Sequence, residues 1–575
     1  MASHDVPLLG SDRAEDLTGH QVLNLFTGAS GDEQLVSKLM SPGTHLLQGC
    51  RGSGKTMLLR VAYERLQRER TDVLPVFVSF SRYLATYNTS ARPTPGFSPF
   101  QSWVLAKMLA SLRDEAQKRL AVRLPQDVFG PVPLDAFAQH LETHYADPSV
   151  ANPSLSAAKL GVSERELRSF ARLDTVRQRI LRILDACKLG AVDFLLDEAA
   201  QSFAEDLQPL FFSLIRHMRH NSIWIKASTY PHTTNYGQDF DVGHDAIILQ
   251  IERQVELDEG MRFFEELIER RFAGTVLGQA LGKSELQVRL MIKASGGVPR
   301  WFIHILNALG HTTAQQLDSN RVVAAIKEFP DSTLWPFLQK VRSGLRAQKK
   351  YVDTAKELVL LFIEHLREYN QRRRPSPYVA ISNHKTVPFR VHAGLGMLQY
   401  AGLISSRGLR KLSKERDNGV LYIIHPAILI KENVLYPGSS TPAIADLVSA
   451  LSSPSKDAFK EYTKNSPHLQ QLHEYEEEQI SCCSNCSAEL SEQAKFCAQC
   501  GAPVAQESPY IELLKRSVEE LELTPGLKRR LIEDGRFKTI GDVVAATDEE
   551  LDQIEYVGKP RLRIIRYATE EFLCG

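Results

Sequence analysis

Three absences limit what this chain of 575 residues can be. No run of about 18 apolar residues occurs, so a membrane-spanning helix is not expected. Lys plus Arg and Asp plus Glu both total 69, so the chain has no overall positive charge for binding nucleic acid, and such contacts must come from local patches. The first residues, MASHDVPLLGSDRAEDL, are acidic and lack the apolar centre of a signal peptide, and we therefore expect a cytoplasmic protein.

Cysteine is also scarce outside one short segment. Five of the eight cysteines lie between Cys482 and Cys500, which suits a reducing compartment and one metal site better than a disulfide framework. Two Cys-x-x-Cys pairs separated by ten residues predict a tetrahedral Zn²⁺ site with the ligands Cys483, Cys486, Cys497 and Cys500. Four thiolates leave no open position for catalysis, so the metal is expected to stabilise a small fold. Residues 479–505 resemble a zinc ribbon, whose partner could equally be nucleic acid or protein.

Apolar strands alternate with helical segments over the first part of the chain. The expected strands are 44–50, 73–80, 191–200, 222–229 and 245–252. This alternation predicts an α/β fold in which a parallel sheet is covered by helices on both faces. Residues 1–255 are expected to form one core, with a helical insertion at about 81–172 that includes a helix over 98–121.

The first strand ends in a glycine-rich loop. Residues 49–56, GCRGSGKT, fit the phosphate-loop pattern G-x-x-x-x-G-K-[ST] and lie between an apolar strand and a helix. Its glycines allow backbone N–H groups to surround phosphates, and the helix N-terminus that follows favours their negative charge. Lys55 is expected to reach the outer phosphates of a triphosphate, and Thr56 to bind Mg²⁺. The expected nucleotide contacts are Gly49, Gly52, Ser53, Gly54, Lys55, Thr56 and Met57.

Another strand ends in acidic residues. In FLLDEAA, Asp197 follows an apolar run and would hold the Mg²⁺ shell, while Glu198 would orient or deprotonate the attacking water. Taken alone, the pair could equally cap the next helix. Together with the phosphate loop, it predicts hydrolysis by bound water rather than phosphoryl transfer to a small molecule.

Two further segments place polar groups near the expected phosphates. WIKASTYP ends a strand with Ser228 and Thr229, where a sensor of the terminal phosphate would lie. GGVPRW opens a helix and could bring Arg300 onto the phosphates. An ordinary strand end and a turn with a solvated arginine are the alternatives for these two segments.

The middle of the chain changes pattern twice. Residues 256–350 are expected to form a helical lid, 351–436 a winged helix, and 437–478 a linker. The segment FRVHAGLGMLQYAGLI would be the recognition helix, and a hairpin turning at Asp417-Asn418-Gly419 would be the wing. The basic residues of the hairpin suit contact with DNA phosphates, although a winged helix used only for protein contact is the alternative. These residues are Arg407, Arg410, Lys411, Lys414 and Arg416, with Arg372 to Arg374 nearby in sequence.

Residues 506–575 are expected to form four or five short helices. The segment LDQIEYVGKPRLRII resembles a helix-hairpin-helix, in which a glycine-bearing turn presents backbone N–H groups to a DNA phosphate. That turn would be Val557 to Lys559, with Arg561 and Arg563 nearby. The many acidic residues between 519 and 555 leave a protein-docking module as the alternative.

In combination, GCRGSGKT, LLDEAA, KASTYP and GGVPRW, followed by a winged helix, resemble the AAA+ ATPases of the origin-recognition and replication-initiator type (ORC-CDC6-like) over roughly residues 20 to 435. The resemblance implies P-loop NTPase roles for the residues quoted above: Lys55 and Thr56 as Walker A, Asp197 and Glu198 as Walker B, Ser228 or Thr229 as sensor 1, and Arg300 as sensor 2. No arginine lies between Thr229 and the strand at 245, where an arginine finger would be expected, which leaves Arg216 and Arg219 as substitutes.

The resemblance implies an ATP-binding and ATP-hydrolysing switch or remodeller that uses Mg²⁺ and acts on DNA, in replication, mobile-element function or antiviral defence. The alternative is a STAND-like signalling ATPase, a type that also departs from the arginine-finger pattern, whose appended modules would dock a protein partner such as a nuclease effector. Assembly into a homo-oligomer is left open by the missing finger. A DNA-translocating motor would need helicase motifs that are not visible in the sequence.

Overall fold

The computed structural model describes most of the chain. The residues described are 14–29, 31–80, 97–120, 130–143, 152–170, 172–198, 207–309, 316–344, 349–412, 418–438, 442–452, 458–472, 481–482, 489–490 and 513–574. Within them, no helix combines the length and the apolar character needed to cross a membrane. The predicted zinc ligands Cys483, Cys486, Cys497 and Cys500 lie outside the described residues, as do Lys414 and Arg416 of the predicted wing.

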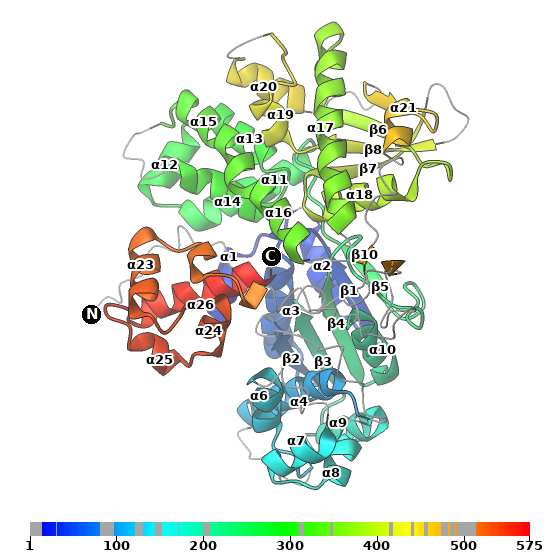
Figure 1. Cartoon of the computed structure of the whole chain (residues 1–575), viewed down its shortest axis with the longest axis vertical. Helices are drawn as coiled ribbons and strands as arrows, with labels where there is room; N and C mark the ends of the chain where they lie inside the picture. Colours follow the sequence, from blue (N-terminus) through cyan, green and yellow to red (C-terminus); the bar gives the residue numbers. More distant parts are fainter. Residues whose placement is uncertain are drawn as a thin grey trace.

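A five-stranded sheet forms the centre of the lower half of the molecule in Figure 1. Its order is β2-β3-β4-β1-β5, and every pairing is parallel. The prediction of an α/β fold with a parallel sheet is therefore confirmed. Because the carboxyl ends of parallel strands meet at one edge, the loops that follow β1, β3 and β4 lie side by side. The strands are β1 (Thr44–Gln48), β2 (Val73–Ser79), β3 (Ala191–Asp197), β4 (Ile223–Thr229) and β5 (Ile247–Gln250).

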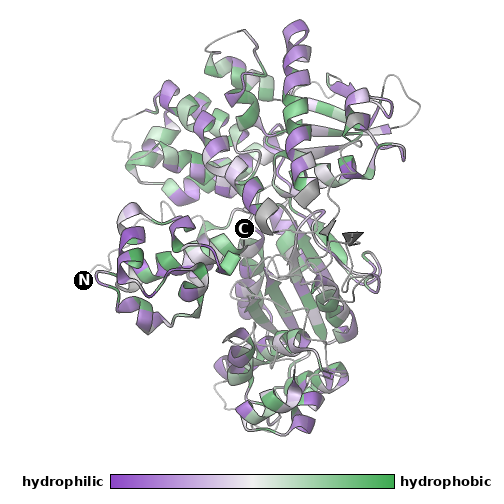
Figure 2. Cartoon of the chain, in the orientation of Figure 1, coloured by the Kyte–Doolittle hydropathy of each residue, from purple (hydrophilic) through white to green (hydrophobic). Residues whose placement is uncertain are grey.

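Helices cover both faces of this sheet. On one face α1 (Gly19–Leu25), α2 (Asp32–Leu39) and α3 (Lys55–Glu69) share a core with Leu47. On the other face α4 (Pro99–Leu120), α9 (Leu173–Ala186) and α10 (Gln208–Met218) share a core with Leu46. Successive side chains of β1 thus enter different cores, as expected for a strand buried on both sides. Figure 2 shows the resulting hydrophobic character of the central strands.

The expected insertion is an all-helical extension at the bottom of Figure 1. Its apolar side chains, among them Trp103, Phe137 and Phe170, belong to the same core as one face of the sheet. The extension is therefore packed onto the sheet rather than held by a linker. Besides α4 it contains α6 (Leu134–Thr143), α7 (Pro153–Leu160) and α8 (Glu164–Phe170), and α9 follows it.

A group of helices over residues 258–344, the helical lid, lies above the sheet in Figure 1. Its helices share a core that also includes residues of the next unit, such as Leu398 and Ile424. The lid therefore packs directly against the next part of the chain. Its elements are α11 (Asp258–Phe272), α12 (Val276–Gly282), α13 (Glu285–Ala294), α14 (Pro299–Ala308), α15 (Ser319–Phe329), a π-helical turn (Pro330–Leu334) and α16 (Trp335–Gly344).

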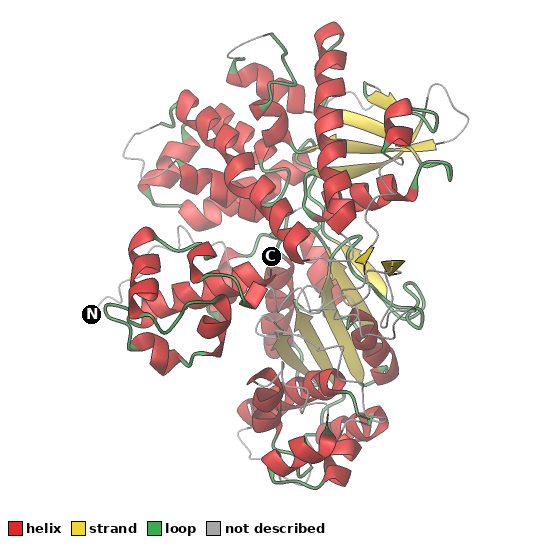
Figure 3. Ribbon diagram, in the orientation of Figure 1, coloured by secondary structure: helices red, strands yellow, loops and turns green. Residues whose placement is uncertain are grey.

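Residues 349–462 build a second, smaller sheet, drawn in yellow at the upper right of Figure 3. We call this part the second-sheet unit. Its strand order is β7-β8-β6-β9, with β6, β7 and β8 antiparallel and β9 parallel to β6. Its elements are α17 (Lys349–Arg372), β6 (Tyr378–Ser382), α18 (Phe389–Tyr400), β7 (Ile404–Lys411), β8 (Asn418–Ile424), α19 (Pro426–Lys431), α20 (Ile444–Leu451) and β9 (Lys460–Tyr462).

Two sequence expectations for this part differ from the structure. Residues 437–478 are not the expected linker, because α20 packs on α13 of the lid, β9 joins the second sheet, and α21 (Pro467–Gln471) follows. The apolar residues of α20, including Leu447 and Leu451, are buried and hold the segment in place. The predicted hairpin is present, since β7 and β8 pair antiparallel, but Asn418 and Gly419 pair within β8 instead of forming its turn, and Asp417 lies outside the described residues.

The end of the chain, residues 513–574, forms a C-terminal helical unit with its own small core around Leu531, Ile540 and Ile565. It lies beside α1 at the left of Figure 1. Tyr567 donates a hydrogen bond from its hydroxyl to Asp16, and Glu522 pairs with Lys340 of α16 at 3.2 Å. The unit contains a 3₁₀ turn (Val518–Glu520), α23 (Pro525–Asp534), α24 (Ile540–Ala545), α25 (Asp548–Asp552) and α26 (Lys559–Cys574). The short strands β10 (Ser481–Cys482) and β11 (Glu489–Leu490), which precede the unit in the chain, pair antiparallel.

Candidate functional site

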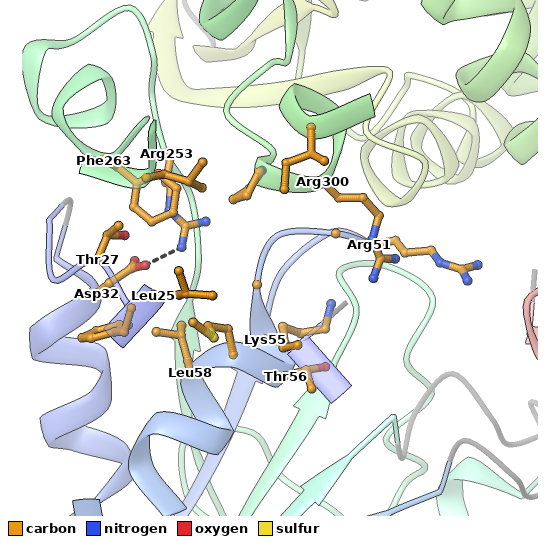
Figure 4. Close-up of a pocket in the computed structure, with 18 of the residues that line it drawn as sticks. Leu25, Thr27, Asp32, Arg51, Lys55, Thr56, Leu58, Arg253, Phe263 and Arg300 are labelled. Carbon is orange, nitrogen blue, oxygen red and sulfur yellow. Dashed lines mark hydrogen bonds and ion pairs between the residues drawn. The ribbon is translucent and has the colours of Figure 1, made fainter. Parts of the chain in front are cut away.

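A pocket opens where the carboxyl edge of the large sheet meets the helical lid. The loop between β1 and α3 forms its floor, and the ends of β3 and β4 form one wall. Lid helices α11 and α14 close it from above, as Figure 4 shows. Residues predicted from three separate sequence motifs, the loop, FLLDEAA and GGVPRW, therefore line a single pocket.

The glycine-rich loop has the backbone geometry that its sequence predicts. Gly52 and Gly54 have φ angles of 78° and 99°, in the left-handed region that side chains disfavour. A Cβ atom at Gly52 would also lie 2.8 Å from the Cβ of Arg300. Gly54 is the N-cap of α3, so Lys55 is the first residue of that helix. The helix N-terminus thus faces the pocket, where it favours anions.

Lys55 is buried at the base of this loop. Its Nζ donates to the carbonyl oxygens of Gly49 and Cys50 at 2.7 and 3.0 Å, and it lies 3.8 Å from the centre of the Tyr230 ring. Burial lowers the pKa of Lys55 to about 7, although Cys50 and Asp197 oppose this shift. The ammonium is therefore held by weak dipoles and a ring face, which a phosphate could replace with full negative charge.

Asp197 and Glu198 end β3 directly beside Thr56. Burial raises the pKa of Asp197 to about 7, with further contributions from Glu198 and Glu15, and a hydrogen bond from Thr56 opposes the shift. Glu198 has φ 57°, a left-handed conformation that is uncommon outside glycine and that occurs at functional sites. A hydroxyl and a buried carboxylate at adjacent positions are oxygen donors of the kind that Mg²⁺ prefers.

Ser228 reaches the site through the strand order, because β4 lies between β3 and β1. Its Oγ accepts a hydrogen bond from the backbone N–H of Glu198 at 2.7 Å. Ser228 therefore contacts the acidic pair directly and holds the backbone of Glu198 in its unusual conformation. Thr229, the other residue considered for this position, is also buried at the end of β4.

Arg300 enters from the lid at the start of α14. Its backbone N–H lies 3.5 Å from the Gly52 carbonyl oxygen, and its positive charge contributes to lowering the pKa of Lys55. Figure 4 places Arg300 and Arg51 above Lys55 and Thr56. The pocket lining thus brings most of the predicted loop residues together with Asp197, Glu198 and Arg300, whereas Gly49 and Ser53 are not part of the lining.

Tyr230 and Arg253 are among the pocket residues that were not singled out from the sequence. Tyr230 directly follows Thr229 and covers the Lys55 ammonium. Arg253 follows β5, bonds the Ser53 carbonyl oxygen at 2.6 Å, and pairs with Asp32. Both stand just past the carboxyl end of a strand, which is the one sequence signal that could have found them.

The other side of the pocket is mainly apolar. Side chains from the segment before α2, from α3 and from the lid line it, and Phe263 lies against the Arg253 guanidinium at 3.9 Å from its ring centre. Such a surface suits the flat face of a base rather than a phosphate. The apolar lining residues are Leu25, Phe26, Met57, Leu58, Phe263, Leu267 and Ile303.

Two aromatic residues, Trp301 next to Arg300 and Tyr230 in the pocket wall, contact the second-sheet unit. Trp301, next to Arg300, packs against Gly402 and against His425, whose ring centre is 5.1 Å away. Tyr230, next to Lys55, packs edge-on against Tyr400 of α18 at 5.6 Å. Tyr230 and Trp301 therefore connect Lys55 and Arg300 with the second-sheet unit.

Two expectations for DNA contact need correction. Arg407 of β7 is buried, because it pairs with Glu252 and Glu256 at 2.7 and 2.8 Å across the boundary with the core. It is unavailable to an external ligand. Helix α18, expected to be the recognition helix, is buried along most of its length between α17 and the core, where Gly396 contacts His232. By contrast, Lys411 and residues 372–374 are exposed.

Arg216 and Arg219, the substitutes considered for an arginine finger, both lie beside Asp245. Arg219 pairs with Asp245 at 2.8 Å, and Arg216 lies 3.7 Å from the same carboxylate. Both side chains are about half exposed, at 49% and 48%. Their role toward a neighbouring molecule stays a prediction.

Comparison with known proteins adds one sequence match. Residues 8–92 match the family model ORC-CDC6-like. This region includes the phosphate loop, α3 and β2. A search of curated proteins finds no match.

Two solved structures are similar at low identity. The Aeropyrum pernix Orc1 protein in complex with DNA shares 15% identity, with a TM-score of 0.31, over 74% of this chain and 95% of that chain. The Walker-type ATPase paby2304 of Pyrococcus abyssi shares 13%, with a TM-score of 0.38, over 74% of this chain and 97% of that chain. The assignment of a P-loop NTPase fold rests on the strand order and the loop geometry described above.

Proposed function

We propose that this protein binds ATP with Mg²⁺ and hydrolyses it, and that the nucleotide sets the arrangement of the lid and the second-sheet unit. The observation that carries this proposal is the meeting of the phosphate loop, Asp197, Glu198 and Arg300 in one pocket. The matched region 8–92, which contains the loop, supports an AAA+ ATPase related to the ORC-CDC6-like family.

The position of each pocket residue indicates its role in binding or hydrolysis. The loop amides and the Lys55 ammonium would hold the phosphates, and Thr56 with Asp197 would hold Mg²⁺. Bound Mg²⁺ supplies positive charge to the β- and γ-phosphates, and it would favour the ionised form of Asp197. Glu198 would accept a proton from the attacking water, while Ser228 fixes its backbone. Arg300 would stabilise charge on the terminal phosphate.

A switch function follows from the neighbours of these residues. Loss of the terminal phosphate would change what Arg300 contacts, and Trp301 would pass that movement to Gly402 and His425. Loss of phosphate contact at Lys55 would in the same way alter its packing with Tyr230, whose ring packs on Tyr400. The nucleotide state would therefore bias the position of the second-sheet unit relative to the core.

We propose that the second-sheet unit acts as a winged helix that contacts DNA through β7 and the end of α17. Arg410 is partly exposed and Lys411 exposed, whereas Arg407 is buried in ion pairs with the core.

The test is duplex DNA binding by Arg410→Ala/Lys411→Ala as a function of salt. We expect weaker binding and a smaller salt slope, by about one unit for each phosphate that the variant no longer neutralises. The control is Lys159→Ala/Arg165→Ala, which removes two exposed charges from the insertion. Equal binding by both variants would contradict the assignment and favour a unit that docks protein.

We further propose that Cys483, Cys486, Cys497 and Cys500 hold one Zn²⁺, since their spacing matches two thiolate knuckles. The purified chain should carry one zinc per molecule, measured by mass spectrometry of the metal content. Cys483→Ser/Cys486→Ser should lose it, and Cys187→Ser should keep it. Zinc retained after the double change would refute the ligand set.

Nucleotide binding is the experiment that tests the main proposal. Lys55→Ala should abolish binding of a fluorescent ATP analogue, because the ammonium is the charged partner of the outer phosphates. The control, Lys226→Met/Asp193→Asn, neutralises a buried pair of the same sheet that lies beside Gly43, before β1, and outside the pocket lining, and it should bind normally. Unchanged binding by Lys55→Ala would overturn the site.

A further inference from the structure

Arg253 occupies a place in the pocket that no motif assigns. Its side chain is 2% exposed, and it makes three different contacts. One guanidinium nitrogen donates to the Ser53 carbonyl oxygen at 2.6 Å, the other pairs with Asp32, and the plane lies over Phe263. Figure 4 shows Arg253 between Asp32 and Phe263.

The contact with Ser53 fixes the direction of a peptide group. In a planar trans peptide the carbonyl oxygen and the following N–H point in opposite directions. The Ser53 carbonyl oxygen is held on the Arg253 side, so the N–H of Gly54 is directed to the other side of the loop. Gly54 is also the N-cap of α3, with φ 99°, which lets this peptide turn without a side-chain clash.

The direction of this N–H matters because Gly54 precedes Lys55. The lysine of such a loop reaches the β- and γ-phosphates, so the amide beside it belongs to the part of the loop that holds the β-phosphate. A preset donor loses no free energy to reorientation when an anion arrives. A peptide free to rotate would present its carbonyl oxygen to the phosphate for part of the time.

Arg253 is itself held on three sides. Asp32, 3% exposed at the start of α2, fixes one nitrogen, and burial raises the pKa of Asp32 while Arg253 opposes that shift. Phe263 of α11 fixes the plane. Gly297 packs so closely on the Arg253 backbone that a Cβ there would lie 2.0 Å from its carbonyl oxygen. Asp32, Phe263 and the Ser53 carbonyl oxygen thus hold the guanidinium, and Gly297 packs against the Arg253 backbone.

We propose that Arg253 is a positioning residue for the nucleotide: with Asp32 it presets the Gly54 amide for the β-phosphate. The inference rests on the proposed nucleotide site and adds a residue to it. The Arg253 guanidinium contacts α2 through Asp32, the phosphate loop through Ser53 and the lid through Phe263. It therefore helps to hold the lid and the loop in a fixed position relative to each other.

The test separates positioning from stability. Arg253→Met alone would leave the buried Asp32 without its charged partner, so the variant to compare is Asp32→Asn/Arg253→Met, which removes both charges. The control is Lys226→Met/Asp193→Asn, which removes another buried ion pair in the domain of the large sheet. The Lys226 Nζ and Asp193 Oδ1 atoms of that pair lie 3.2 Å apart. Each protein is assayed for its melting temperature and for its affinity for ADP and AMP, by displacement of a fluorescent analogue.

The expected result is a loss that depends on the β-phosphate. Asp32→Asn/Arg253→Met should melt within a few degrees of the wild type, bind ADP at least about tenfold more weakly, and bind AMP with less than about a twofold change. The control should change neither affinity. Equal weakening for ADP and AMP, or no weakening for ADP, would overturn the positioning role. Failure of the wild type to bind ADP at all would instead refute the proposed nucleotide site.

Discussion

The contact between Trp301 and Gly402 can be tested with a pair of matched glycine substitutions. Gly402 has φ 70°, and a Cβ there would lie 2.0 Å from Cη2 of Trp301. Gly408, in the same unit, has φ 84° with nothing within 4 Å of a Cβ. A left-handed conformation costs a residue with a Cβ about 1–2 kcal/mol, which applies to alanine at both positions. Overpacking of a core adds about 1–3 kcal/mol, which applies only to Gly402.

Gly402→Ala should therefore lose about 2–5 kcal/mol of stability and Gly408→Ala about 1–2 kcal/mol. Thermal unfolding without nucleotide measures the difference between the two. Nucleotide affinity supplies the functional readout, because displacing Trp301 moves Arg300, whose backbone lies against Gly52. Gly402→Ala should bind ATP more weakly, and Gly408→Ala should bind it as the wild type does. Equal losses of stability, or equal nucleotide affinities, would refute the idea that Trp301 links the pocket to the second-sheet unit.

Two further predictions concern buried charges. Burial raises the pKa of Asp193 to about 6, although Lys226 beside it opposes the shift. The protonated carboxyl therefore stabilises the fold fully below about pH 4, and this contribution is lost as the pH rises through 6. Removing Lys226 raises the pKa of Asp193 further. Lys226→Met should therefore lower the free energy of unfolding by about 3–5 kcal/mol at pH 8 and by less at pH 5. Urea unfolding measures this, and a loss that does not depend on pH would contradict the prediction. Arg407→Met should lower the melting temperature because the buried Glu256 carboxylate loses the guanidinium that pairs with it, and Arg407→Met/Glu256→Gln should recover part of the loss. No recovery would show that the ion pair is not the cause.

The sheet and the meeting of the predicted residues in one pocket could be predicted because their signals are local. β1 is an apolar run followed by Gly49, and β3 is an apolar run that ends at Asp197. Parallel pairing brings the carboxyl ends of both strands to one edge of the sheet. The positions of Lys55, Asp197 and Arg300 in one pocket follow from that rule together with the helix that begins at Pro299. The left-handed backbone of Glu198 could not be anticipated, since non-glycine residues seldom adopt it.

Contacts between distant segments were not predictable. Asp32 and Arg253 are 221 residues apart, and nothing near either one indicates the other. Arg407 looked like one more basic residue of an exposed hairpin. A register shift between Ser406 and Leu409 interrupts the alternation of β7, so its inward direction cannot be read from sequence periodicity. Residues 437–478 looked like a linker because polar residues flank the short apolar stripe of α20.

Hydrolysis by Glu198 is the central claim, and one comparison tests it directly. ATP turnover and ATP binding are measured for the wild type and for Glu198→Gln, which keeps the size of the side chain but cannot accept the proton of the attacking water. The account predicts that the wild type hydrolyses ATP, and that Glu198→Gln binds ATP with similar affinity and turns it over at least about a hundredfold more slowly. Normal turnover by Glu198→Gln would contradict the assignment of the acidic pair and of the reaction.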